Sequence, residues 1–174
     1  MHLNHPDITT VLVTADEIAE KVLELAGELD SYYQDKDPLL VGVLKGAVPF
    51  VADLSRAMQL STSQDWMAVS SYGSGTTSSG VVRILKDLDT DVTDRHVLIV
   101  EDIIDSGLTL SWLTTNLANR GAASVEVVTL LRKPGAAKVQ INVRWVGFDI
   151  PNEFVVGYGL DYNERYRSLD GVGV

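Results

Sequence analysis

The sequence contains no cysteine and no apolar run near the roughly 20 residues that span a bilayer. Without cysteine, a disulfide framework, a thiolate zinc site and a thiol nucleophile are excluded. Basic residues are also few, because 14 Lys and Arg stand against 24 Asp and Glu, a formal net charge of −10. Such an acidic chain is poorly suited to the phosphates of nucleic acid. We therefore expect a cytosolic protein with neither nucleic acid nor membrane as its partner.

Apolar patterns of helical and strand type alternate along the chain. A capping-box pair, Thr14 and Glu17, predicts a helix that runs to about Tyr33. Further helices are expected at 49–58 and 108–120, and strands at 39–44, 66–71, 81–85, 96–100 and 124–131. This alternation predicts an α/β fold with a central, mainly parallel twisted sheet flanked by helices. No linker is visible, so we expect a single domain over residues 1–174.

Polar residues follow three of the predicted strands. Lys45-Gly46, Glu101-Asp102 and Arg132-Lys133 each come directly after a separate apolar run. Because the carboxyl ends of parallel strands meet at one edge of a sheet, we expect these residues to share a rim where ligands bind.

The most informative segment is 98–109, in which an apolar strand ends in Glu101 and Asp102 and small residues then open a helix. Backbone N–H groups at such a helix start can cradle a phosphate, and Gly107 suits a close approach of the backbone to the anion. Phosphate repels carboxylates, so a divalent cation or sugar hydroxyls should lie between them. The pattern indicates a sugar phosphate that carries Mg²⁺. The alternative is a pair of solvated strand-end carboxylates, which rarely follow a fully apolar strand without a partner.

The segment 100–109 resembles the phosphoribosyl-pyrophosphate signature of the type I phosphoribosyltransferases. Leu44-Lys45-Gly46, the loop 70–73, Arg132-Lys133-Pro134 and the segment 148–167 resemble the bacterial hypoxanthine-guanine branch of that family, and the similarity covers about residues 10–170. The resemblance implies the type I phosphoribosyltransferase fold, with a core of about 10–150, a base-binding hood at about 148–170 and a flexible lid loop at 70–80. It also implies a homodimer or homotetramer.

The reaction that the resemblance implies is purine salvage. Mg²⁺-bound 5-phosphoribosyl-1-pyrophosphate would transfer its phosphoribosyl group to hypoxanthine or guanine, giving IMP or GMP and pyrophosphate. An enzyme that prefers xanthine and guanine is the alternative within the family. A nucleotide-binding regulator on the same fold is less favoured, because it should carry a basic face.

The resemblance assigns binding roles residue by residue. The ribose hydroxyls would contact Glu101 and Asp102, directly or through Mg²⁺, and Asp161 would help to hold a second Mg²⁺. In the family, the loop at Lys45-Gly46 contains a non-proline cis peptide bond. The 5′-phosphate would lie on Ser106, Gly107, Leu108 and Thr109, and pyrophosphate near Lys45, Gly46, Ser71, Tyr72 and Arg167.

Four residues are implied on the purine side, and the sequence leaves an alternative open for each role. Asp105 resembles the general base that takes the proton from purine nitrogen 7, but it could equally be the N-cap of the following helix. Lys133 would donate to the 6-oxo group, or is a solvated charge. Phe154 would stack on the purine and the Val155 backbone would bind its edge, or both belong to the core. The family commonly carries basic residues where this chain has Gly-Ala-Ala at 135–137, which could shift the purine preference.

Overall fold

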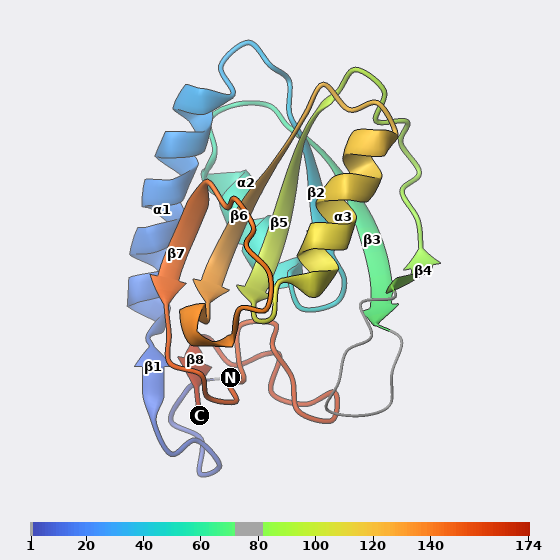
Figure 1. The fold of residues 1–174 in the computed structure, drawn as a ribbon. Helices are drawn as coiled ribbons and strands as arrows, with labels where there is room; N and C mark the ends of the chain where they lie inside the picture. Colours follow the sequence, from blue (N-terminus) through green and yellow to red (C-terminus); the bar gives the residue numbers. More distant parts are fainter. Residues whose placement is uncertain (1, 72–81) are drawn as a thin grey trace.

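The computed structural model describes residues 2–71 and 82–174, and Figure 1 shows the order of its elements. No helix among these residues is long and apolar enough to cross a membrane. The helices are α1 (Ala15–Tyr32), α2 (Val48–Ala57) and α3 (Leu108–Asn119), with a short 3-10 turn at Pro134–Ala136. The strands are β1 (Val11–Val13), β2 (Leu39–Val43), β3 (Ser63–Ser71), β4 (Val82–Lys86), β5 (His96–Ile104), β6 (Ser124–Arg132), β7 (Trp145–Asp149) and β8 (Val172–Gly173).

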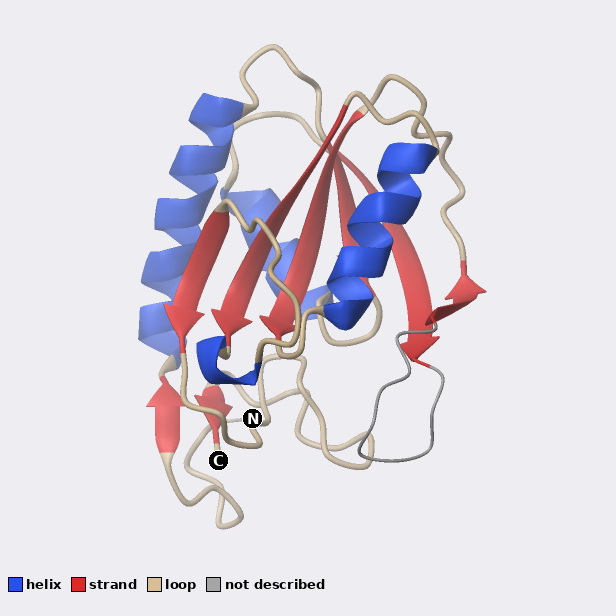
Figure 2. Ribbon diagram, viewed as in Figure 1, coloured by secondary structure: helices blue, strands red, loops and turns tan. Residues whose placement is uncertain are grey.

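The central sheet has six strands in the order β4-β3-β2-β5-β6-β7. Neighbouring strands are parallel except β3 and β4, which are antiparallel. Helices α1 and α2 pack on one face of the sheet and α3 packs on the other (Figure 2). The predicted α/β fold, with a mainly parallel sheet between helices, is confirmed.

The local sequence explains where the first two helices begin. The Thr14 hydroxyl accepts from the Glu17 N–H at 3.2 Å and the Glu17 carboxylate accepts from the Thr14 N–H at 2.8 Å, so the predicted capping box is present. One stripe of α1, which includes the fully buried Leu29, packs into the core. Pro49 lies in the first turn of α2, where its missing N–H removes no helical hydrogen bond.

The central strand is longer than the sequence predicts. β5 continues past Val100 to Ile104 because its ladder with β6 continues, with Glu101 opposite Thr129. Glu101 and Asp102 therefore lie within the strand, and the prediction that they follow its end was wrong. At Glu101 and beyond, β5 pairs with β6 alone, and this ladder holds the carboxylates more rigidly than a loop would.

Three strands have no counterpart in the sequence prediction. β7 forms one edge of the sheet beside β6, and β1 pairs with β8 through Val11 and Gly173. The pairing of β1 with β8 joins the two ends of the chain (Figure 1). It depends on a distant partner, and local periodicity carries no signal for it.

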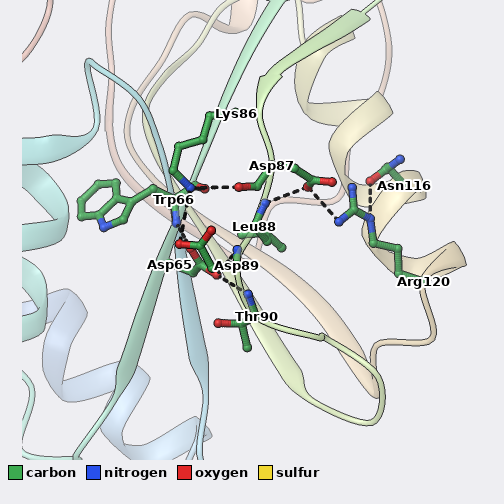
Figure 3. A network of polar contacts seen from close by, with 9 residues as sticks. All are labelled: Asp65, Trp66, Lys86, Asp87, Leu88, Asp89, Thr90, Asn116 and Arg120. Atoms are coloured by element: carbon green, nitrogen blue, oxygen red, sulfur yellow. Dashed lines mark hydrogen bonds and ion pairs between the residues drawn. The ribbon is translucent and has the colours of Figure 1, made fainter.

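A polar network fixes the base of the β3–β4 pair (Figure 3). Asp65 is buried, and its carboxylate accepts from the backbone N–H groups of Trp66, Asp89 and Thr90 at 2.7 to 2.9 Å. The Asp87 carboxylate lies 2.9 Å from the Arg120 guanidinium, and this ion pair links the β3–β4 pair to the end of α3. These contacts fix the start of β3 and the segment after β4, at the end of the pair away from residues 72–81.

Candidate active site

The carboxyl ends of β2, β5 and β6 lie at one edge of the sheet, drawn as the lower edge in Figure 1. Lys45-Gly46 follows β2, Glu101-Asp102 lies near the end of β5, and Lys133 follows β6. The structure thus brings the three polar pairs to one rim, as the sequence predicts.

Glu101 and Asp102 form a pair of carboxyl groups with little access to water. Glu101 is only 7% exposed, so solvated strand-end carboxylates are not what the structure contains. Burial raises the pKa of Glu101 well above its usual value, and the adjacent Asp102 charge raises it further. Burial also raises the pKa of Asp102, against a 2.7 Å hydrogen bond from the Ile103 N–H to its carboxylate. The pair is suited to hold a proton, or to bind a cation or hydroxyl groups that replace water.

The segment after β5 leads into α3, and the start of this helix is where the sequence predicts an anion cradle. Gly107 is the N-cap, no side chain caps the helix there, and the Ser106 hydroxyl accepts from the Leu108 N–H at 3.3 Å. A helix start leaves further N–H groups without helical partners, and Thr109 follows in the first turn. A cavity of about 220 Å³ opens here, lined by residues that include Glu101, Asp105, Ser106, Gly107 and Thr109.

Backbone conformation and packing both require glycine at position 107. Its φ is +83°, a conformation that side chains rarely adopt. A Cβ at Gly107 would also lie 2.9 Å from Ile141 and 3.3 Å from Val139. The segment after β6 therefore packs over the start of α3 and would crowd any side chain at this position.

Asp105 and Lys133 face each other at this edge. The Lys133 Nζ lies 3.4 Å from an Asp105 carboxylate oxygen, and only 8% of the Lys133 side chain is exposed. Asp105 caps no helix, because the N-cap is Gly107. The alternatives of an N-cap at Asp105 and a solvated Lys133 were both wrong. A nearly buried ammonium beside a half-exposed carboxylate is an arrangement that can donate to one ligand atom and accept from another.

The turn after β2 packs tightly between β5 and the C-terminal segment. The peptide bond Leu44-Lys45 is cis, one residue before the Lys45-Gly46 bond considered from the sequence. A Cβ at Gly46 would clash with the Asp102 carboxylate, and a Cβ at Gly159 would clash with the Gly46 carbonyl. Glycine at both positions lets the C-terminal segment, the turn and the carboxyl pair approach closely.

A cluster of charges surrounds this turn. Arg167 donates to the Gly159 carbonyl at 2.7 Å and lies 3.5 Å from Asp161, and its charge opposes the rise that burial causes in the pKa of Asp102. Glu164 lies 3.0 Å from Lys45 and 3.2 Å from Arg167. Sequence reasoning missed Glu164, because an isolated Glu in a polar segment gives no signal of the two cations that the fold brings to it.

The predicted purine-binding pair divides between surface and core. Phe154 is 64% exposed and its ring packs edge-on against Tyr162 with centroids 5.9 Å apart, so the alternative of a core Phe154 was wrong. Val155 is buried among core residues, which leaves its backbone as the group for a ligand. Ser71 ends β3, and Tyr72 and most of the predicted lid loop, 70–80, lie outside the described residues.

Carboxylate oxygens suited to Mg²⁺ are present, but they are spread over two segments. Among residues 2–71 and 82–174, no group of three or more His, Cys, Asp or Glu side chains could hold a metal ion alone. Mg²⁺ commonly binds through one or two carboxylates together with substrate phosphates and water. Glu101 and Asp102 fit one such metal and Asp161 fits a second, and each metal would arrive with a phosphorylated substrate.

A larger cavity of about 650 Å³ lies beside the phosphate cradle. Its walls are Ile104–Gly107, residues 132–134 at the end of β6, Ala137 and residues 139–143. Ala137 lies in this wall. Where the family commonly carries basic residues, this chain therefore places a small side chain at the edge of the cavity. Sequence reasoning missed the contribution of 139–143, which has no regular structure.

A mainly parallel sheet with a helix start and buried carboxylates at its carboxyl edge is an arrangement in which α/β proteins bind phosphorylated ligands. The family model "Phosphoribosyl transferase domain" matches residues 11–163. The chain belongs to the phosphoribosyltransferase family.

Known relatives agree with this assignment. A hypoxanthine-guanine phosphoribosyltransferase of Mycobacterium avium is 58% identical over 173 residues, covering 96% of this chain and 85% of the relative. The enzyme of the same name from Bacillus subtilis is 56% identical over 168 residues, covering 97% and 93%. A solved hypoxanthine phosphoribosyltransferase of Staphylococcus aureus superposes with a TM-score of 0.95 at 45% identity, covering 98% of this chain and 92% of that one.

Proposed function

We propose that the chain is a purine-salvage enzyme that transfers the phosphoribosyl group of 5-phosphoribosyl-1-pyrophosphate to hypoxanthine or guanine. The products would be IMP or GMP and pyrophosphate. The observation that carries this proposal is the pairing of Lys133 with Asp105 at 3.4 Å, beside the anion cradle of α3. It supplies a hydrogen-bond donor and a proton acceptor next to a phosphate site, as transfer to a 6-oxopurine requires.

The sugar phosphate would lie between the cradle and the carboxyl pair. The 5′-phosphate would accept from the N–H groups at the start of α3 and from the hydroxyls of Ser106 and Thr109. Glu101 and Asp102 would contact the ribose hydroxyls, directly or through Mg²⁺. As the bond from the anomeric carbon to pyrophosphate breaks, positive charge develops on the sugar, and nearby carboxylates stabilise it.

The purine would lie beside Lys133 and Asp105. Lys133 donates to the 6-oxo group of hypoxanthine or guanine, whereas adenine presents an amino group that is itself a donor, so adenine is rejected. A purine ring nitrogen forms the new bond to the anomeric carbon, and Asp105 takes the proton from nitrogen 7. Phe154 would stack on the ring and the Val155 backbone would bind its edge.

Pyrophosphate would leave toward the turn after β2. Lys45, the Gly46 backbone and Arg167 are the groups that would bind it, with Ser71 and Tyr72 completing the site. Asp161 would help to hold the second Mg²⁺, which neutralises charge on the leaving group.

Further features are proposed from the resemblance. The segment 148–170 would act as the base-binding hood, and the loop 70–80 would exclude water from the reacting sugar. A homodimer or homotetramer is expected and can be measured by sedimentation. The cytosolic location expected from the sequence stays a prediction.

A purine panel tests the proposal. Purified protein is given 5-phosphoribosyl-1-pyrophosphate and Mg²⁺ with hypoxanthine, guanine, xanthine or adenine separately, and ultraviolet absorbance follows nucleotide formation. We expect turnover of hypoxanthine and guanine and none of adenine. Turnover of xanthine and guanine alone would contradict the proposal and indicate the alternative enzyme that prefers these two purines. Binding of the sugar pyrophosphate without turnover of any purine would indicate a regulator.

A further inference from the structure

Glu164 bridges two cations that come from opposite sides of the candidate site. Its carboxylate lies 3.0 Å from the Nζ of Lys45, which follows β2, and 3.2 Å from a guanidinium nitrogen of Arg167 in the C-terminal segment. Hydrogen bonds from both cations lower the pKa of Glu164, so it is ionised at neutral pH. One anion therefore pairs with both cations.

These contacts are easily broken. About two thirds of each side chain is exposed in the Lys45–Glu164 pair, at 66% and 64%, and exposed ion pairs stabilise proteins only slightly. Arg167 has other contacts that keep it in place, since it donates to the Gly159 carbonyl at 2.7 Å and lies 3.5 Å from Asp161. Loss of Glu164 would therefore release Lys45 and leave Arg167 in position.

We propose that Glu164 is a placeholder for pyrophosphate: an internal anion that pairs with Lys45 and Arg167 and competes with the incoming substrate for them. The inference rests on the proposed function, in which these two cations bind the pyrophosphate group. Substrate binding must break both contacts with Glu164, so its carboxylate weakens substrate binding. The same competition speeds the departure of pyrophosphate, because the carboxylate recaptures the cations as the product leaves.

Removal of the charge at position 164 tests this role. In Glu164→Gln the amide keeps the shape of the side chain but pairs weakly with cations. We expect the dissociation constants of 5-phosphoribosyl-1-pyrophosphate and of pyrophosphate, measured by calorimetry with Mg²⁺, to fall roughly three- to tenfold. The KM for hypoxanthine should not change. When product release limits turnover, kcat should fall, because pyrophosphate leaves more slowly.

Two further variants separate charge from structure. Glu164→Asp keeps the negative charge, so its affinity for both ligands should stay close to that of the unmodified protein. Glu153→Gln removes an exposed carboxylate from the same segment that contacts neither Lys45 nor Arg167, so it should bind both ligands normally. Thermal unfolding confirms that each variant is folded.

The outcomes distinguish this inference from the function on which it rests. If the unmodified protein turns over hypoxanthine but Glu164→Gln binds the two ligands equally or more weakly, Glu164 positions the cations instead of competing for them, and only the inference is overturned. If the unmodified protein does not bind 5-phosphoribosyl-1-pyrophosphate at all, the proposed function and the inference both fall.

Discussion

Replacing Glu101 with Gln should stabilise the fold while it damages the site. Glu101 is 7% exposed, and its closest charged neighbour in the site is another carboxylate, Asp102. Gln fills nearly the same volume without a charge. Even a buried ion pair can be replaced by uncharged residues of similar volume with a gain of up to about 1 to 4 kcal/mol, and Glu101 has no cation to offset its burial. We expect the lower half of that range, because Glu101 can avoid the full penalty by holding a proton.

The effect should depend on pH in a defined direction. The pKa of Glu101 is raised in the folded protein above its ordinary value of 4.5, first by burial and then by Asp102. Above pH 4.5 the unfolded chain therefore releases a proton that the folded protein retains, and stability falls as the pH rises toward the folded pKa. Gln does not titrate, so the advantage of the variant should be small at pH 4 and about 1 to 2 kcal/mol at pH 8.

Thermal unfolding measures this difference. For a chain of this length, about 1 to 2 kcal/mol corresponds to a rise in Tm of roughly 2 to 8 °C at pH 8. The matched control is Glu126→Gln in the neighbouring strand, which removes a carboxylate paired with Arg144 at 3.3 Å and should lower the Tm slightly. Turnover by Glu101→Gln should fall by about ten- to a hundredfold, because hydrogen bonds from ribose to a neutral amide are weaker. A Tm that is unchanged or lower at pH 8, or a difference independent of pH, would refute the reasoning.

The remaining predictions concern the fold and the turn after β2. Asp65→Ala leaves three backbone N–H groups without their acceptor and should cost about 2 kcal/mol by denaturant unfolding. These hydrogen bonds outweigh burial and lower the pKa of Asp65, so its contribution should be lost as the pH falls below 3.8; an equal difference at pH 2 and pH 7 would contradict this. Leu29→Ala, at a fully buried position, should cost about 3 kcal/mol in the same assay, and a loss below 1 kcal/mol would mean that the core is not packed there as described. Gly46→Ala should abolish turnover, because its methyl group clashes with Asp102; normal turnover would show that the turn can move.

Local patterns in the sequence were sufficient for much of the fold. The capping box at Thr14 and the apolar runs of β2, β5 and β6 carry their own signals, since helix starts and buried strands depend on neighbouring residues. The predicted end of β5 was wrong, because Glu101 remains in the ladder through its pairing with β6. The pairing of β1 with β8 was missed because it depends on contact between the two ends of the chain.

In the candidate site, too, features formed within one segment could be predicted and features that depend on distant residues could not. Adjacent carboxylates and the helix start at Gly107 lie within one segment, so their proximity could be predicted. The choice between general base and N-cap at Asp105 could not, because it depends on where α3 begins. Glu164 gave no signal, since its partner Lys45 lies far away in the sequence.

The most direct test of the central claim is hypoxanthine turnover by the unmodified protein and by Asp105→Asn, with 5-phosphoribosyl-1-pyrophosphate and Mg²⁺. Asn keeps the shape of Asp105 but cannot take the proton, so the account predicts IMP formation that falls by about 10² to 10⁴ in a variant that is still folded and still binds the sugar pyrophosphate. Equal turnover by the two proteins, or no turnover by the unmodified protein, would contradict it.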